Sequence, residues 1–149
     1  MLTVNTYLGP SRVHGIGLFA AEDIPAGAFV WKFNHHVDKI FKQQDFVAMC
    51  RKVDSCCLRH LLNSTYRRGS RYFYLTDNAR FINHSDDRDN IVFLTDFAEV
   101  AKTDIAAHQE ILENYNLAYD SSDYFFMEMV NPDPVHYLQS QQPEQRSHA

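Results

Sequence analysis

Apolar and polar residues alternate over several short stretches of the chain. Residues 2–7 (LTVNTY) have the two-residue period of a half-buried strand. Similar short runs, rich in β-branched and aromatic residues, predict further strands at 17–20, 29–33, 72–75, 90–94, 98–101 and 110–112. Turn residues at 9–11 (GPS) and 24–27 (IPAG) separate the first three strands. The pattern therefore predicts a domain rich in short strands.

One segment has the period of a helix instead. From Gln44 to Leu62 the apolar positions are three or four residues apart, so they share one helix face: Phe46, Val47, Cys50, Val53, Cys57, Leu58, Leu61 and Leu62. Asp54 and Ser55 are expected to divide this helix in two, with Ser55 as an N-cap. Short strands with one helical insertion, at about 43–63, predict a β-rich α+β domain over residues 1–138. Residues 139–149 are rich in Ser, Gln and Pro and are expected to be disordered.

Composition narrows the functional classes. A chain of 149 residues is long enough for one domain with a hydrophobic core. The net charge of −5 argues against direct nucleic-acid binding, which depends on neutralising phosphates. No segment approaches the roughly 20 apolar residues that cross a bilayer, and the first twenty residues do not resemble a signal peptide. We therefore expect a protein of the cytoplasm, or of the nucleus in a eukaryote, without a membrane partner.

The three cysteines lie close together in the helical segment. Cys50, Cys56 and Cys57 are odd in number, which implies no disulfide framework and favours a reducing compartment. Paired spacing such as Cys-x2-Cys, typical of zinc ligands, is missing, so no metal site is predicted. The three thiols are expected to be buried or half-buried on the helix.

Three motifs occur in a fixed order along the chain. They are His14 to Ala20 (HGIGLFA), Arg80 to Ser85 (RFINHS) and Glu110 to Tyr115 (EILENY). A Gly-x-Gly turn alone is common, and Asn-His-Ser also fits a glycosylation sequon, but the ordered set is specific. Together the motifs resemble the SET-domain family of protein-lysine methyltransferases, over roughly Val13 to Tyr115. The resemblance implies small curved sheets around a helical insertion, with a C-terminal pseudoknot.

The resemblance also implies a cofactor, S-adenosyl-L-methionine, and a protein or peptide substrate that bears a lysine. The implied cofactor-binding residues are His14, Gly15, Gly17, Arg80, Phe81, Asn83, His84 and Tyr115. Glycines allow the backbone to approach a ligand closely, while Asn83 and His84 can donate and accept hydrogen bonds. Phe81 and Ile82 would anchor their segment in the core. Tyr115 is the implied catalytic residue, whose hydroxyl would orient the lysine amine.

Methyl transfer to an amine is an in-line displacement that needs a neutral nitrogen and a narrow, dry site. The positive charge of a sulfonium and desolvation would both lower the pKa of the substrate lysine. Aromatic rings would form the lysine channel, because their faces accommodate both methylenes and a cationic nitrogen. The candidates are Tyr72, Tyr74, Tyr119, Tyr124, Phe125 and Phe126.

The sequence departs from the family pattern at three positions. Asp86 replaces a frequent Cys, His108 replaces a frequent Gly, and Glu113 replaces a frequent aromatic residue. If Glu113 faces the lysine channel, it would recruit a protonated lysine and make activity depend steeply on pH. No Cys cluster follows Tyr115, so residues 122–130, a partner or a second subunit must close the site. The oligomeric state stays open, a homodimer included.

Two other functions remain open. The chain could be a non-catalytic SET-like module that binds cofactor or a protein partner, although the presence of Tyr115 favours an enzyme. It could also be a β-rich interaction protein in which residues 80–85 are only structural.

Overall fold

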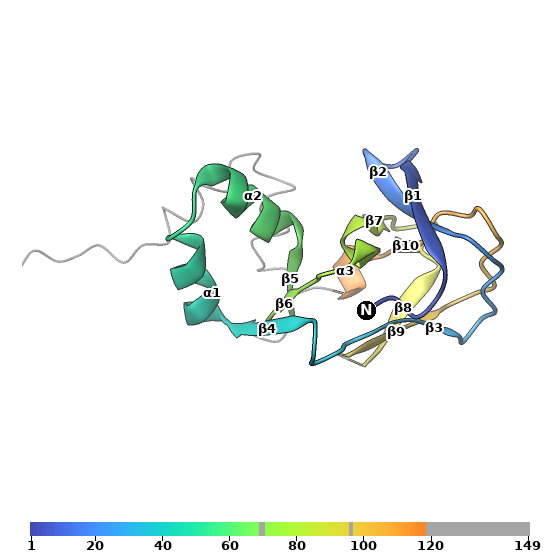
Figure 1. Ribbon diagram of the computed structural model, residues 1–149. Coiled ribbons are helices and arrows are strands. Elements are labelled where there is room, and N and C mark those ends of the chain that lie inside the picture. The colour runs from blue at the N-terminus through green and yellow to red at the C-terminus, as the bar shows by residue number, and fades with distance from the viewer. Residues whose placement is uncertain (69–70, 96, 119–149) are drawn as a thin grey trace, which may run out of the picture.

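The computed structural model describes residues 1–68, 71–95 and 97–118, which form ten strands and four helical segments (Figure 1). The strands are β1 (Thr6–Pro10), β2 (Ile16–Ala20), β3 (Phe29–Lys32), β4 (Lys39–Lys42), β5 (Thr65–Arg68), β6 (Arg71–Tyr74), β7 (Asn83–His84), β8 (Ile91–Thr95), β9 (Ala98–Ala101) and β10 (Leu112–Glu113). The helical segments are α1 (Gln43–Cys50), α2 (Ser55–Asn63), the 3-10 helix η1 (Asn78–Phe81) and α3 (Tyr115–Ala118). No helix in these ranges is long and apolar enough to span a membrane.

The strands form three small sheets. Strands β1 and β2 are an antiparallel hairpin, β4-β6-β5 is an antiparallel sheet, and β3-β9-β8-β10-β7 is a mixed sheet of five strands. Figure 1 shows the helical insertion at one end of the molecule and the β1–β2 hairpin at the other. This arrangement confirms the predicted β-rich α+β class with small sheets and one helical insertion.

The C-terminal part of the described chain is threaded between two earlier strands. Strand β10 lies parallel between β7 and β8, although those two strands are consecutive in sequence. Both ends of the loop 85–90 bond to β10, through Ser85 N to Glu113 O and Asn90 N to Leu112 O, each at 3.0 Å. The loop therefore holds β10 in place, as the predicted pseudoknot requires, and Tyr115 follows directly after it.

The first strand was predicted too early in the chain. Residues 2–7 do alternate, but their first part is tied to β3 by a single bridge, Leu2 to Trp31, and by bonds from Thr3 N to Val30 O and from Thr3 Oγ1 to Phe29 O. The hairpin strand instead runs through Gly9 and Pro10, which pair with residues 16–17. The predicted turn at residues 9–11 thus begins later, because pairing with β2 outweighs the local turn preference.

The helical insertion has its own small core, formed by Phe46, Cys50, Leu58, Leu62 and Tyr72. The break is at the predicted place, but the N-cap of α2 is Asp54, whose carboxylate accepts from Cys57 N at 2.8 Å. The prediction for Ser55 was therefore wrong by one residue. Cys50 is buried, which raises the pKa of its thiol to about 11, whereas Cys56 and Cys57 are exposed.

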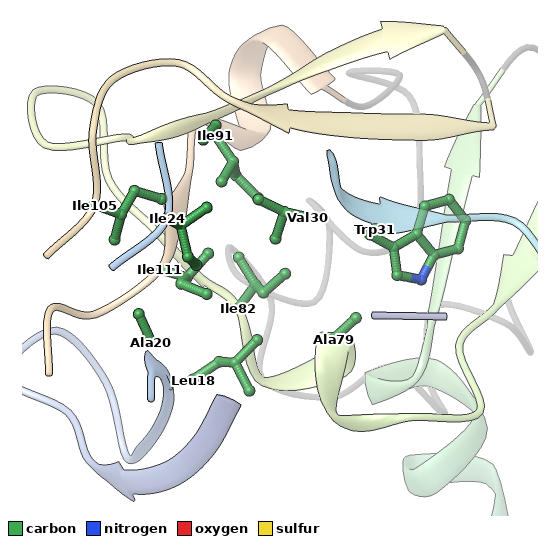
Figure 2. Packing of buried hydrophobic residues seen from close by; sticks show 11 residues of the cluster. Leu18, Ala20, Ile24, Val30, Trp31, Ala79, Ile82, Ile91, Ile105 and Ile111 are labelled. Carbon is green, nitrogen blue, oxygen red and sulfur yellow. The ribbon is translucent and has the colours of Figure 1, made fainter. Parts of the chain in front are cut away.

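The main core lies between the hairpin, the five-stranded sheet and η1. Figure 2 shows its aliphatic side chains converging from these elements, with Trp31 at one side of the cluster. Leu18 and Ala20 point into this core, but Phe19 lies on the other face of β2 and stacks on Tyr7 at 5.5 Å. Successive residues of a strand face opposite sides, so Phe19 lies outside the core that its two neighbours enter.

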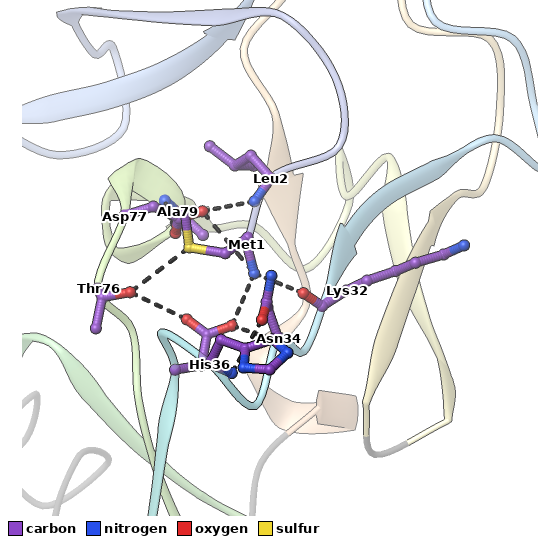
Figure 3. A network of polar contacts seen from close by, with 9 residues as sticks. Met1, Leu2, Lys32, Asn34, His36, Thr76, Asp77 and Ala79 are labelled. Atoms are coloured by element: carbon purple, nitrogen blue, oxygen red, sulfur yellow. Dashed lines mark hydrogen bonds and ion pairs between the residues drawn. The ribbon is translucent and has the colours of Figure 1, made fainter.

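A polar network joins the first residues to the segment before η1 (Figure 3). The Met1 amine donates to Lys32 O at 2.6 Å and to the buried carboxylate of Asp38 at 2.9 Å. Thr76 Oγ1 donates to the other oxygen of Asp38 at 3.1 Å, and Leu2 N donates to Asp77 Oδ2 at 2.5 Å. The network connects the end of β3 with the approach to residues 80–85.

His108 has a backbone conformation that suits glycine. Its φ is +69°, and its Nδ1 lies 3.0 Å from Tyr7 Oη. The left-handed region is unfavourable for a residue with a Cβ, which explains why Gly is frequent here in the family that the motifs resemble.

We expect His108→Gly to be more stable than His108→Ala by about 1 kcal/mol, because both lose the imidazole and only Ala keeps the strained Cβ. Urea unfolding of the two variants measures this difference. Equal stability, or a more stable Ala variant, would contradict the strain at His108.

Candidate active site

Asn83 joins the second motif to the other two. Its Nδ2 lies 3.0 Å from His14 O, 3.1 Å from Ile16 O and 3.1 Å from Glu110 Oε1. These contacts hold the Gly-x-Gly turn against β7 and the start of the third motif. The structure thus brings the three motifs to one place, as their resemblance to a known family implies.

The two glycines of the first motif are required for different reasons. Gly15 has a φ of +52° with open space around an added Cβ, so the position needs the left-handed conformation. Gly17 instead leaves room for the Glu110 carboxylate, because a Cβ at Gly17 would lie 2.2 Å from Glu110 Oε1. A side chain at Gly17 would displace Glu110 from Asn83.

Glu110 and Asn90 are site residues that the sequence analysis did not select. Asn90 is buried, donates from Nδ2 to Glu110 O at 2.8 Å and accepts from Leu112 N at 2.9 Å. One amide therefore satisfies two backbone groups of the segment that leads to Tyr115. Two features of the sequence could have identified them. Glu110 is the first residue of the third motif, and Asn90 ends the loop that follows the second motif.

His84 contacts Tyr115 from the neighbouring strand. Its Nδ1 accepts from Tyr115 N at 3.0 Å, and the two rings stack with centroids 5.1 Å apart. Nδ1 must then be unprotonated, which places the proton on Nε2, 3.3 Å from Asp86 Oδ1. Asp86 Oδ1 also accepts from Asn116 Nδ2 at 2.7 Å. The carboxylate at position 86 therefore orients the His84 ring and ties the loop to α3.

Tyr115 is buried at the first residue of α3, directly after the threaded strand. Its hydroxyl donates a hydrogen bond to Ile82 O. Burial, followed by the charges of Glu113 and Glu99, raises the pKa of Tyr115 well above its ordinary value of 10.0. Tyr115 is therefore a neutral phenol at physiological pH, suited to donate or accept hydrogen bonds but not to act as a phenolate base.

Arg80 and Phe81 lie at the edge of this arrangement. The Arg80 guanidinium is 4.9 Å from the centroid of the Phe81 ring, and both side chains are half-buried. The expectation that Phe81 anchors the core was wrong, because Phe81 is only half-buried and does not belong to the main core, whereas Ile82 does.

Glu113 and Glu99 place two carboxylates inside the domain. Glu113 is 2% exposed and Glu99 is 5% exposed. Burial and the charge of Glu113 raise the pKa of Glu99 well above its ordinary value of 4.5. Burial and both carboxylates likewise raise the pKa of Tyr66. Glu113 does not point to bulk solvent, which was the alternative that the sequence left open.

The structure describes two of the six aromatic residues that were predicted to form the lysine channel. Tyr72 stacks on Phe46 at 4.6 Å in the core of the insertion, and Tyr74 Oη lies 3.0 Å from His60 Nε2. Tyr119, Tyr124, Phe125 and Phe126 lie outside the described residues, as do 122–130 and the predicted tail 139–149.

A cleft of about 540 Å³ opens beside Glu110, lined by Pro10, Arg12, Phe19, Arg88, Asp89, Asn90, Thr103, Gln109, Glu110 and Leu112. None of the eight predicted cofactor residues lines it. Asn90 and Glu110 border both the cleft and the candidate site, so the cleft adjoins the site without containing the predicted cofactor residues.

Comparison with protein families matches residues 15–116 to the SET domain. The chain belongs to the SET-domain family. The match covers all of the second and third motifs and most of the first. Comparison with curated proteins found no match.

Solved structures share the SET fold. Polycomb repressive complex 2 of Chaetomium thermophilum matches with a TM-score of 0.56 and 25% identity, over 78% of this chain and 16% of that one. The same complex in an autoinhibited conformation bound to S-adenosylmethionine matches with a TM-score of 0.59 and 23% identity, over 87% of this chain and 17% of that one. A candidate histone methyltransferase of Plasmodium falciparum matches with a TM-score of 0.51 and 19% identity, over 76% of this chain and 95% of that one. The chain thus spans about a sixth of the polycomb chains that it resembles.

Proposed function

We propose that this SET domain transfers a methyl group from S-adenosyl-L-methionine to a lysine side chain of a protein substrate. One observation carries the proposal. Asn83 and His84, adjacent on β7, bond to the glycine turn on one side and to the backbone of Tyr115 on the other. The turn proposed to bind the cofactor and the backbone of the proposed catalytic residue, Tyr115, are thus bonded to the same two residues.

The residues present suit this cofactor. Its amino-acid part carries an ammonium, and the carbonyls of His14 and Ile16 and the Glu110 carboxylate are acceptors that can take a further donor beside the Asn83 amide. Gly17 keeps the space in which a Cβ would collide with Glu110. When bound, the cofactor supplies an electrophilic methyl group on a positively charged sulfur.

The chain itself must orient and desolvate the lysine. The lysine nitrogen has to be neutral before it attacks, because an ammonium lacks the lone pair that forms the new C–N bond as the S–C bond breaks. The Tyr115 hydroxyl is buried and neutral, so it can accept from the amine or contact the methyl through weak C–H···O interactions. A dry, prearranged site of this kind lowers the barrier through positioning.

The substrate class follows from family membership and from charge. The resembling polycomb structures include one in complex with H3K27me3, a trimethylated histone lysine. A net charge of −5 suits a basic, lysine-bearing segment, although it does not select one protein. We therefore propose a lysine-bearing protein or peptide as the substrate and leave its identity to experiment.

Asn83→Ala should weaken cofactor binding by about 1–3 kcal/mol, because the carbonyls of the turn and the Glu110 carboxylate lose the amide that holds them together. Calorimetric titration with S-adenosyl-L-methionine measures this loss. Asn116→Ala is the matched control, since Asn116 is exposed and its side-chain amide donates to Asp86 and not to the glycine turn.

Two results would contradict the cofactor assignment: unchanged affinity in Asn83→Ala, or loss of binding in the native protein when a chelator is added. The alternative function, a non-catalytic module, predicts cofactor binding without turnover on any lysine-bearing protein. A methyl-transfer assay on the same preparation separates these two functions.

A further inference from the structure

Two carboxylates share one face of the five-stranded sheet. Glu113 on β10 pairs with Ile91 on β8, and Ile91 pairs with Ala101 on β9. Directly opposed residues of a sheet point to the same side, so all three side chains share a face. Glu99 is two residues before Ala101 on β9 and therefore lies on that face as well. The register thus places both carboxylates, each almost fully buried, on the inner side of one sheet.

This carboxylate pair, Glu99 and Glu113, lies near the candidate catalytic hydroxyl. Glu113 is two residues before Tyr115, and the charges of both carboxylates act on Tyr115 as well as on Tyr66 of β5. Both side chains are buried, and Glu113 is directly opposite His84, whose ring stacks on Tyr115.

Packing alone does not explain the pair. Burying an ionised carboxylate costs several kcal/mol, and apolar residues of similar size would fill a core at no such cost. Buried carboxylates that perturb each other are found preferentially where proteins hold or transfer protons. In this chain the reaction proposed above needs a proton to leave the substrate lysine.

We propose that Glu113, with Glu99 beside it, accepts the proton that the lysine ammonium must lose before methyl transfer. This inference rests on the proposed function. In the step, the N–H bond of the ammonium breaks and an O–H bond forms on Glu113, so a cation and an anion become two neutral groups. The neutral nitrogen then uses its lone pair to form the C–N bond, and Glu113 releases the proton to water after the product leaves.

The surroundings favour this direction of transfer. A dry site of low dielectric disfavours separated charges, and a neighbouring sulfonium repels an ammonium, so both effects lower the pKa of the lysine. Glu99 counteracts the weak basicity of a single carboxylate, because two close carboxylates retain one proton to higher pH than either alone. Glu99 is thus a positioning and tuning residue, and Glu113 is the acceptor.

Other charged groups also act on the pair. The Met1 amine and the Arg68 guanidinium lower the pKa of Glu99, and Asp77 raises it. Each of these effects is smaller than the effects of burial and of the Glu113 charge. Neighbouring His84 is opposite Glu113 in the parallel pairing of β7 and β10.

The test compares Glu113→Gln with the native protein in single-turnover methyl transfer to a lysine peptide across pH, at saturating cofactor. Without an internal acceptor only the free amine reacts, so the variant should be at least about 10-fold slower at neutral pH. Its rate should then rise about 10-fold per pH unit below the lysine pKa, more steeply than the native rate. This is the reverse of the expectation from the sequence, in which Glu113 itself made the activity depend steeply on pH. Parallel pH profiles of the two proteins would overturn the proposal.

Controls separate this inference from the proposed function. Glu22→Gln, which alters an exposed carboxylate bonded to Asn5, should keep the native profile. Calorimetry should show native cofactor affinity in Glu113→Gln. If the native protein transfers no methyl group, the proposed function fails; if it transfers methyl groups and the variant keeps its pH profile, only the proton-acceptor role fails.

A second variant tests the pair through stability. The raised pKa of Glu99 stabilises the folded protein at pH below 4.5, and that contribution is lost as pH rises toward the folded-state pKa. Glu99→Gln should therefore have a higher Tm than the native protein at pH 8 and a similar Tm near pH 4. A Tm difference that does not change with pH would contradict a buried, coupled pair.

Discussion

Tyr115→Phe is expected to lose at least about 100-fold in kcat while keeping its fold and most of its cofactor affinity, as is typical when one prearranged polar group of an active site is removed. Only the hydroxyl is removed, and the ring keeps its stacking on His84. The loss of the bond to Ile82 O should cost about 1 kcal/mol of stability. We therefore expect the substitution to lower kcat without lowering the amount of folded protein.

Steady-state kinetics with circular dichroism on the same samples measures both quantities. Tyr74→Phe is a matched control, because its hydroxyl contacts His60 in the insertion and not residues 82–84. A Tyr115→Phe variant with native kcat would remove this hydroxyl from the mechanism, and an unfolded variant would show that its role is structural.

Asn90→Ala has the second largest expected effect, a loss of about 2–4 kcal/mol of stability, since two buried backbone groups lose their partner at once. These groups are Glu110 O and Leu112 N, which the Asn90 amide bonds on either side of Ile111. Because the same segment carries Tyr115, activity should fall further than the loss of folded protein explains.

Urea unfolding measures the stability change, and Asn116→Ala again supplies a control with an exposed amide. Asn90→Asp refines the test: its carboxylate can still accept from Leu112 N but cannot donate to Glu110 O. We expect it to be destabilised as well. Native stability in Asn90→Ala would mean that the loop 85–90 holds β10 without this side chain.

Sequence patterns predicted the strands and helices of this fold better than they predicted which strands pair. Alternation and strand-forming residues located β2, β3, β6, β8 and β9, and the helical period located α1 and α2. The short strands β4 and β5 were missed, because each has only four residues, two of them charged, and so carries too little periodicity. Pairing depends on residues far apart in sequence, so β1 was placed by local alternation at 2–7 and not by its register with β2.

The motifs predicted which residues form the candidate site and their order along the chain, but not which of these residues contact one another. The motifs selected Asn83, His84 and Tyr115, yet nothing in the sequence indicated that the Asn83 amide reaches the carbonyls around Gly15. Asn90 and Glu110 were overlooked because their roles come from the threading of β10 between β7 and β8. That topology was implied only by the family resemblance, since periodicity carries no information about which strand enters between two others.

Glu113 illustrates the limit most clearly. From sequence it could face either the lysine channel or solvent, because a shift of one residue in register exchanges the two faces of a strand. The pairing with Ile91 and the burial of the side chain place it inside the domain, and its proximity to Glu99 had no sequence signature.

The central claim, methyl transfer to lysine, is tested most directly by incubating the full chain with methyl-labelled S-adenosyl-L-methionine and an array of lysine-bearing peptides. The products are read by mass spectrometry. The account predicts labelled methyl groups on lysine nitrogen in a subset of peptides, lost when that lysine is replaced by Arg and when the enzyme carries Tyr115→Phe. Cofactor binding without label on any peptide or on mixed basic proteins would contradict it.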